Sequence, residues 1–126
     1  MNKPKEIDIG FEIDYQKLWS LDIPVEEINI SLLEYNMAFP YLEQEWTDDW
    51  NLTPRMLIKN FEKEISHAKK VNESDLSYPI EIYFHNDSWI ILDGIHRYVK
   101  SVKNGLKTIK VRKVPKSLII KVKRCS

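Results

Sequence analysis

The clearest pattern of hydrophobic and polar positions lies in the last third of the chain. Residues 79–84, PIEIYF, and 88–92, SWIIL, are short runs rich in aliphatic and aromatic residues, with HND between them. Two such runs separated by a turn predict a β-hairpin. Residues 96–104 have the spacing of a short helix ended by Gly105, and residues 108–114, TIKVRKV, alternate like a strand. This order predicts an α+β domain with a small mixed sheet.

Weaker patterns precede this region. Residues 7–13, IDIGFEI, place apolar side chains at every second position, which predicts a half-buried strand. Pro24 lies in SLDIPVEEINI and favours an edge strand or an entry turn over a central strand. Ser31 is suited to cap a short helix through LLEYNM, which Pro40 ends.

Two further elements are expected from apolar spacing. Thr53 and Pro54 are typical of a helix start, with Thr at the N-cap and Pro in the first turn. Residues 54–70 then carry one apolar stripe that runs from Leu57 to Ala68, which predicts one long helix. After Pro115, the sequence SLIIKVK predicts one more strand.

Length and composition indicate one domain spanning residues 1–126, with enough apolar material, 43% of residues, for one core. No window approaches 18 uncharged apolar residues, and the first ten residues have no apolar segment typical of a secretory signal. The single cysteine, Cys125, excludes an internal disulfide or a cysteine metal cage. Together these features predict a cytoplasmic protein.

The net charge of zero conceals an uneven distribution. All 19 acidic residues lie within residues 1–96, whereas 11 of the 19 basic residues lie within residues 97–126. One interpretation is a solvated face, or an intramolecular complement to the acidic part. The other is a surface that attracts a nucleotide, a phosphate or a nucleic acid. Nucleic-acid domains are typically basic overall, so nucleic acid is the secondary expectation.

The richest chemistry lies at the junction WIILDGIHR. An apolar strand ends at Asp93, Gly94 permits a tight turn, and a helix begins at Ile95 or His96, where free N–H groups favour an anion. His96 and Arg97 are cations at the unfavourable end of that helix, which indicates a bound anion. Asp93 could then hold a divalent cation or take a proton from a hydroxyl. Alternatively, Asp93 caps the helix and pairs with Arg97, and His96 is a half-buried polar residue.

Residues 79–115 resemble the core of the ParB/sulfiredoxin superfamily. Its members have an apolar strand, a motif such as D-G-x-H-R, a short helix, a glycine, and a strand that ends at a proline-bounded turn. SLDIPVEEINI is similar to an earlier strand of that superfamily. The resemblance implies a ParB/sulfiredoxin-like fold, a small mixed sheet with a few packed helices.

The resemblance also implies a ligand. Members of the superfamily hold nucleotide phosphates at this turn: ATP in sulfiredoxin, CTP in partition proteins and ADP in free-serine kinases. Carried over to this chain, the nucleotide-binding residues are Gly94, Ile95, His96 and Arg97, with Asp93 as the polar residue at the strand end. In the serine kinases an early glutamate acts as the base, which implies a catalytic role for Glu26 or Glu27, beside the interpretation that both are solvated acids.

The chain departs from two activities of the superfamily. Sulfiredoxin needs a cysteine where this chain has Ile95, and Cys125 is too distant in sequence to be assumed to replace it, so reduction of a sulfinic acid is not expected. The DNA-binding domain that follows the core in partition proteins is not expected here, because the sequence continues only about ten residues beyond that core. The first hypothesis is a nucleotide-binding domain that acts as a Mg²⁺-dependent phosphotransferase on a small hydroxyl-bearing molecule. The alternative is a non-catalytic module that binds nucleotide or nucleic acid, or modulates a partner; nuclease activity ranks last.

Two groups of residues outside the motif also need an interpretation. The segment from Trp46 to Trp50 is acidic and aromatic. A tryptophan there could stack on a base and an aspartate could bind a metal, or the tryptophans could belong to the core with the acids in water. His67 and His85 are too widely spaced to indicate a metal site, and we expect both to be structural.

Overall fold

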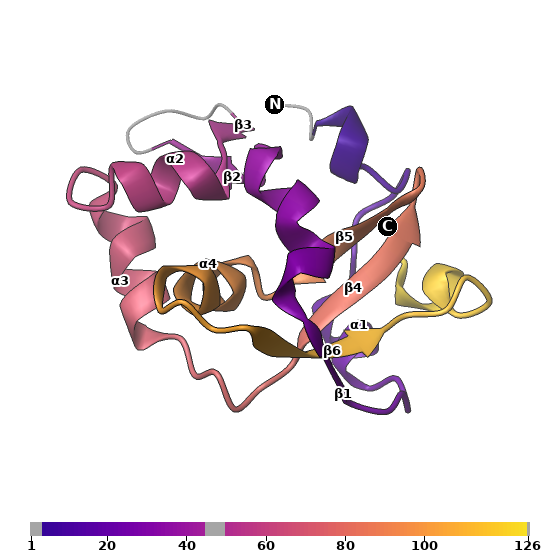
Figure 1. Cartoon of the computed structure of the whole chain (residues 1–126). Helices are drawn as coiled ribbons and strands as arrows, with labels where there is room; N and C mark the ends of the chain where they lie inside the picture. Colours follow the sequence, from indigo (N-terminus) through magenta and orange to yellow (C-terminus); the bar gives the residue numbers. More distant parts are fainter. Residues whose placement is uncertain (1–3, 45–49, 126) are drawn as a thin grey trace.

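The sheet at the centre of the molecule has four strands and mixed direction. The computed structural model describes residues 4–44 and 50–125. Its main strands are β1 (Glu26–Asn29), β4 (Ile80–His85), β5 (Ser88–Asp93) and β6 (Thr108–Lys113). They lie in the order β1-β6-β4-β5, with β4 and β6 parallel and the other neighbours antiparallel. With the helices around it (Figure 1), this sheet confirms the predicted α+β class.

The β4–β5 hairpin has the predicted turn. Asn86 and Asp87 both have positive φ, 49° and 64°, which suits the right-handed twist of the flanking strands. His85 pairs with Ser88 across the turn, and Ile82 with Ile91 further along. The predicted hairpin is therefore confirmed.

The helices lie on two sides of the molecule. α4 (Ile95–Lys103) directly follows β5, and α2 (Pro54–Lys59) and α3 (Ile65–Glu73) pack against it on the left of Figure 1. α1 (Tyr15–Trp19) packs against the 3-10 helix η3 (Ile119–Val122) elsewhere. α4 buries Tyr98 and Val99 and ends before Gly105, whose φ is +71°, so the predicted helix and its glycine stop are confirmed.

The outer edge of β5 is closed by side chains. The 3-10 helix η2 (Ile30–Ala38) packs beside β5, and its buried Asn36 donates to the Trp89 carbonyl at 2.8 Å. The Ile91 N–H donates to the Tyr41 hydroxyl at 2.9 Å, and that hydroxyl donates to the Asn36 side chain. These contacts satisfy backbone groups that an exposed edge would leave open. β1 forms the other edge of the sheet, as Pro24 predicts.

The predicted strand at residues 7–13 is wrong. The structure has a short 3-10 helix, η1 (Lys5–Ile7), and Ile13 makes only an isolated bridge to Lys123. The Gly10 N–H donates to the Asp8 carboxylate at 2.8 Å, and Gly10 has a φ of +91°. This side-chain turn redirects the backbone, although Ile7 and Ile13 are buried as the alternation suggests.

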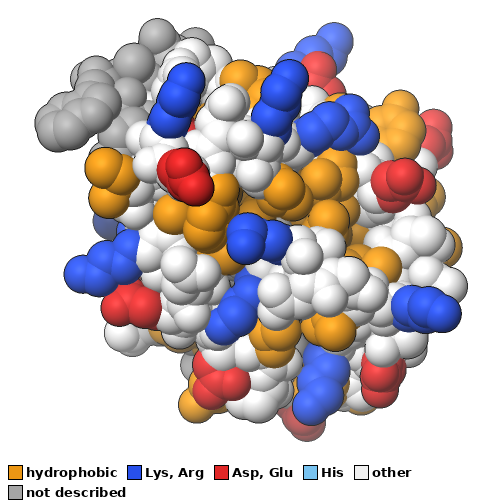
Figure 2. Space-filling model, turned by 60° about the vertical axis from the view of Figure 1, so that its left-hand side comes forward, with side chains coloured by type: hydrophobic (Ala, Val, Ile, Leu, Met, Phe, Trp, Pro, Cys, Tyr) orange, Lys and Arg blue, Asp and Glu red, His pale blue; other side chains and the backbone are white. Residues whose placement is uncertain are grey.

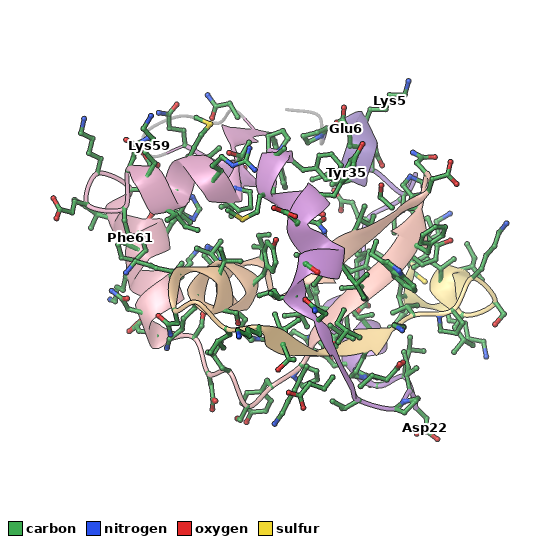
Figure 3. All side chains as sticks on the ribbon, in the orientation of Figure 1. Lys5, Glu6, Asp22, Tyr35, Lys59 and Phe61 are labelled. Carbon is green, nitrogen blue, oxygen red and sulfur yellow. The ribbon has the colours of Figure 1, made fainter. Side chains whose placement is uncertain are left out.

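The predicted helix over residues 54–70 is two helices. Thr53 caps α2 as expected, because its hydroxyl accepts from the Met56 N–H at 3.1 Å. α2 ends at Asn60, whose backbone is not helical, and α3 begins at Ile65. Phe61 lies in the turn between them (Figure 3), where the Lys103 ammonium is 4.6 Å from its ring centroid. Ile65 is 67% exposed, so the apolar stripe is not continuous.

Two smaller predictions were also wrong. Asn29, not Ser31, caps η2, and its side chain accepts from the Ser31 N–H at 3.0 Å. The sequence SLIIKVK forms η3 instead of a strand, because local turns follow Pro115: the Leu118 N–H donates to the Pro115 carbonyl at 2.9 Å.

A two-stranded ladder, β2 (Leu42–Glu43) with β3 (Trp50–Leu52), completes the described elements. Among residues 4–44 and 50–125, no helix has the length and apolar character needed to cross a membrane.

Candidate functional site

The turn between β5 and α4 requires glycine. Gly94 has a φ of +101° and stands at the N-cap of α4. A Cβ at this position would lie 2.5 Å from Cγ2 of Ile80, inside any acceptable contact. The left-handed backbone and the close approach of β4 therefore each favour glycine here. The predicted strand–glycine–helix junction is confirmed.

Asp93 bonds to α1 rather than to its own helix. Its carboxylate accepts from the Trp19 indole N–H at 2.8 Å. α4 has no side-chain cap, and no ion pair joins Asp93 to Arg97 within the described residues. The interpretation of Asp93 as a helix cap paired with Arg97 is thus wrong. Asp93 instead positions Trp19, a residue 74 positions away.

His96 contacts a second histidine. Its Nε2 is 3.1 Å from Nδ1 of His67, and the two rings stack with centroids 5.3 Å apart. His67 Nε2 is 2.6 Å from the Glu43 carbonyl. A carbonyl only accepts, so His67 donates from Nε2. When His67 carries no other ring proton, its Nδ1 accepts from Nε2–H of His96. His67 is therefore part of the neighbourhood of the motif, which its position in the sequence did not indicate.

The His96 imidazole is uncharged at neutral pH. Burial, followed by the nearby His67 and Lys70, lowers the pKa of His96 to about 4. The imidazole accordingly serves as a neutral hydrogen-bonding group between α3 and α4. This placement does not favour His96 as a cation for phosphate, and a phosphate-binding role for it stays a prediction from the motif.

Arg97 points to the opposite side of the turn. Its guanidinium donates to the Pro79 carbonyl and borders a hollow of about 410 Å³. We call this the arginine hollow; its lining residues are Trp19, Tyr78, Pro79, Glu81, Arg97 and Arg112. A guanidinium has five N–H donors, and only one hydrogen bond to Arg97's side chain is found among the described residues. The group is therefore able to bind a ligand as well.

Glu81 and Arg112 are two buried ionisable residues that line the arginine hollow. Arg112 lies 3.4 Å from the Glu81 carboxylate, with side chains only 10% and 4% exposed, and it also donates to the Leu21 carbonyl. Glu81 pairs with Arg112 on one side and with Asp93 on the other in the sheet register, so the three side chains share one face. Burial and then Asp93 raise the pKa of Glu81 to about 7, against the lowering effect of Arg112 and Arg97. This pair was not predicted from the sequence; its signal was an acid inside the otherwise apolar strand PIEIYF.

A second, smaller hollow lies on the other side of the turn. It has about 110 Å³ and is bordered by Asp93, Gly94 and Ile95, with chiefly aliphatic and aromatic side chains around them. Its size is suited to a few water molecules and not to a nucleotide. The side chains of the five motif residues thus have different surroundings. The His96 and Arg97 side chains lie on opposite sides of the turn.

The two early glutamates lie on the opposite edge of the sheet. Glu26 is 3.3 Å from the Lys113 ammonium, and Glu27 accepts from the Thr108 hydroxyl at 2.6 Å. β6 and β4 lie between β1 and β5, so three strand spacings of roughly 4.8 Å put about 14 Å between the edge strands. A base must come within hydrogen-bond reach of its proton, so this geometry does not favour either residue. Their catalytic role stays a prediction.

The described residues do not fit a metal site held by the protein. They contain no group of three or more His, Cys, Asp or Glu side chains suited to a metal ion. The Asp93 carboxylate is already bound to Trp19. The acidic segment Trp46–Asp49 lies outside the described residues, and Trp50 begins β3.

Comparisons with known proteins give a distant likeness. No protein-family model and no curated protein matches the chain. Among solved structures, the chain is similar to sulfiredoxin from Arabidopsis thaliana, with 16% sequence identity and a TM-score of 0.39, over 80% of this chain and 99% of that chain. A likeness this distant carries no activity over. The assignment to the α+β class rests on the sheet and helices of this chain. The functional proposal rests on the geometry of the site.

Proposed function

We propose that this chain is a nucleotide-binding domain whose ligand occupies the arginine hollow. The observation that carries the proposal is the convergence of two guanidinium groups, Arg97 and Arg112, on one hollow that also has exposed aromatic side chains. Trp19 is 55% exposed and Tyr78 is 63% exposed. Large aromatic side chains in water beside paired arginines are typical of sites that bind a ring and a phosphate together.

The proposed assignment of contacts follows from the chemistry of each group. The planar fork of Arg97 is suited to phosphate oxygens, and Arg112 provides a second positive charge. Trp19 or Tyr78 supplies a face for the base, and the hydrogen bond from Trp19 to Asp93 fixes the indole ring. A volume of about 410 Å³ is within the usual range of small-molecule sites.

ATP is the first nucleotide to test, followed by ADP and CTP, which the resemblance of residues 79–115 also implies. Mg²⁺ would enter with the nucleotide, held by phosphate oxygens and water, because Mg²⁺ keeps much of its hydration in such complexes. Gly94 shapes the turn that places Arg97. Gly94, Ile95 and His96 are not assigned direct contacts in this proposal.

Phosphotransfer to a small hydroxyl-bearing molecule stays a prediction. It requires a base beside the acceptor, and neither Glu26 nor Glu27 lines the arginine hollow, although β1 pairs with β6, the strand of Arg112. The arrangement therefore supports a binding module better than a kinase. Release of ADP from ATP in the presence of pooled metabolites would restore the kinase hypothesis.

The proposal is tested by calorimetric titration of ATP into the protein and two variants. Arg97→Gln removes the charge but keeps a donor for the Pro79 carbonyl, and we expect it to weaken binding roughly 10- to 100-fold, the value of charge-assisted hydrogen bonds. Lys110→Gln is the matched control, because Lys110 is an exposed cation on β6 outside the hollow. Equal affinity of all three proteins, or no binding of any nucleotide, would contradict the proposal.

A further inference from the structure

We infer that Glu81 couples nucleotide binding to proton uptake: above neutral pH the carboxylate is ionised in the empty arginine hollow, and it takes a proton when a phosphate group enters. This inference rests on the proposed function. It makes Glu81 the residue that sets the net charge of the hollow, and therefore the charge of the anion that the hollow accepts.

Charged groups from three neighbouring elements face Glu81. Asp93 faces it from β5, Arg112 from β6, and Arg97 from the first turn of α4. The Tyr78 hydroxyl lies in the segment before β4, and α1 contributes the uncharged Trp19 indole. Glu81 itself is nearly fully buried, so water does little to stabilise its charge.

The charges in and beside the hollow cancel when Glu81 is ionised. Arg97 and Arg112 carry two positive charges, and Glu81 and Asp93 carry two negative ones. A phosphate group at about −2 would then meet no net attraction. Protonation of Glu81 leaves one net positive charge and releases Arg112 from its ion pair, so that its N–H groups can turn to the phosphate.

The direction of the coupling follows from electrostatics. Entry of an anion adds negative charge beside Glu81 and competes for Arg112, and both effects favour the neutral acid. The pKa of Glu81 is about 7 in the empty protein, so binding raises it further. At about pH 8 the free carboxyl is mostly ionised and the bound one protonated, and by linkage the affinity falls up to tenfold per pH unit. Well below pH 7 the carboxyl is already protonated and uptake disappears.

The test is titration of ATP at about pH 8 in two buffers that differ in ionisation enthalpy, because the difference in heat counts the protons taken up. We expect an uptake approaching one proton for the wild-type protein and for Glu12→Gln, a glutamate paired with Arg124 outside the hollow. Glu81→Gln keeps an acceptor for Arg112 and should bind ATP with no uptake and no fall in affinity as the pH rises.

The outcomes separate the two proposals. Absence of binding heat from every nucleotide overturns the proposed function, and the coupling with it. Binding with equal heats in the two buffers overturns the coupling alone. If Glu81→Gln does not fold, infrared difference spectra of the wild-type protein decide: addition of ATP should convert a carboxylate band into a protonated carboxyl band, and an unchanged carboxylate region overturns the inference.

Discussion

At the residue scale, Gly94 shows the most direct link from sequence to site. Its positive φ and the contact with Ile80 together bring β4, β5 and the first turn of α4 within reach of one another. The motif predicts this glycine because a strand that turns directly into a helix needs a backbone that other residues rarely adopt. Arg97 enters the arginine hollow only because α4 starts at this point.

We expect Gly94→Ala to lower the free energy of unfolding by about 3 kcal/mol, from an overpacked contact with Ile80 together with left-handed strain. Gly105→Ala is the matched control: its φ is also positive, but nothing lies within 4 Å of the added Cβ, so the loss should be about 1 kcal/mol. Urea denaturation measures both. A similar loss of unfolding free energy in the two variants would show that Ile80 leaves room for a Cβ at position 94.

The histidine pair gives the protein a defined response to acid. The pKa of folded His96 is about 4, below its ordinary value of 6.5, so between these values the unfolded chain binds more protons. Stability is therefore expected to fall as the pH decreases from about 6.5 to 4, by roughly 2 kcal/mol after allowance for partial exposure.

The histidine prediction is checked by urea denaturation across this pH range. Carboxylates also titrate in this range. The quantity to compare is therefore the slope of the free energy of unfolding against pH, for each variant and for wild type. His96→Gln should flatten the slope, and His85→Gln, at the hairpin turn, should leave it unchanged. A His96→Gln protein as acid-sensitive as wild type would show that the pair does not restrain the imidazole.

The contacts between residues that are distant in the sequence could not be predicted from the sequence. Asp93, Gly94 and Arg97 are adjacent, so their proximity follows from the local motif. His67 and His96 are separated by 29 positions, and Glu81 and Arg112 by 31, and their contacts depend on how α3 and β6 pack. No spacing rule joins such pairs. Glu81 was visible only as an acid in an apolar strand.

At the element scale, short-range signals were sufficient for the hairpin, α4 and β6. Each has a strong period and a local stop, such as Asn86–Asp87 or Gly105. Prediction failed where a local hydrogen bond or a change in backbone conformation redirected the chain. The hydrogen bond from Gly10 to Asp8 ended the expected strand, and the break at Asn60 divided the expected long helix. These competing local bonds are invisible to periodicity.

The closure of β5 by η2 provides a test at this scale. Asn36→Leu keeps a similar size but removes the donor to the Trp89 carbonyl and the acceptor for the Tyr41 hydroxyl. We expect a loss of about 3 kcal/mol, because buried partners are left without hydrogen bonds. Asn72→Leu on the exposed surface of α3 is the control and should change stability by less than about 0.5 kcal/mol. Thermal unfolding compares them; equal stability would contradict the role of Asn36.

At the scale of the whole molecule, ion pairs among the described residues compensate part of the uneven charge distribution. Three ion pairs, Arg112–Glu81, Lys113–Glu26 and Arg124–Glu12, each join a base from residues 97–126 to an acid from residues 1–96. On the face shown in Figure 2, Lys and Arg side chains are interspersed with Asp and Glu. Both observations favour an intramolecular complement over a basic surface for nucleic acid, which stays the secondary prediction.

The central claim is that the arginine hollow, on the Arg97 side of the turn, is where a nucleotide binds. A crystal structure of the protein with ATP and Mg²⁺ tests it most directly. We predict phosphate oxygens within hydrogen-bond distance of Arg97 and Arg112, and the base against Trp19 or Tyr78. Phosphates at the Gly94–His96 side of the turn, with Arg97 still bound only to the Pro79 carbonyl, would contradict it.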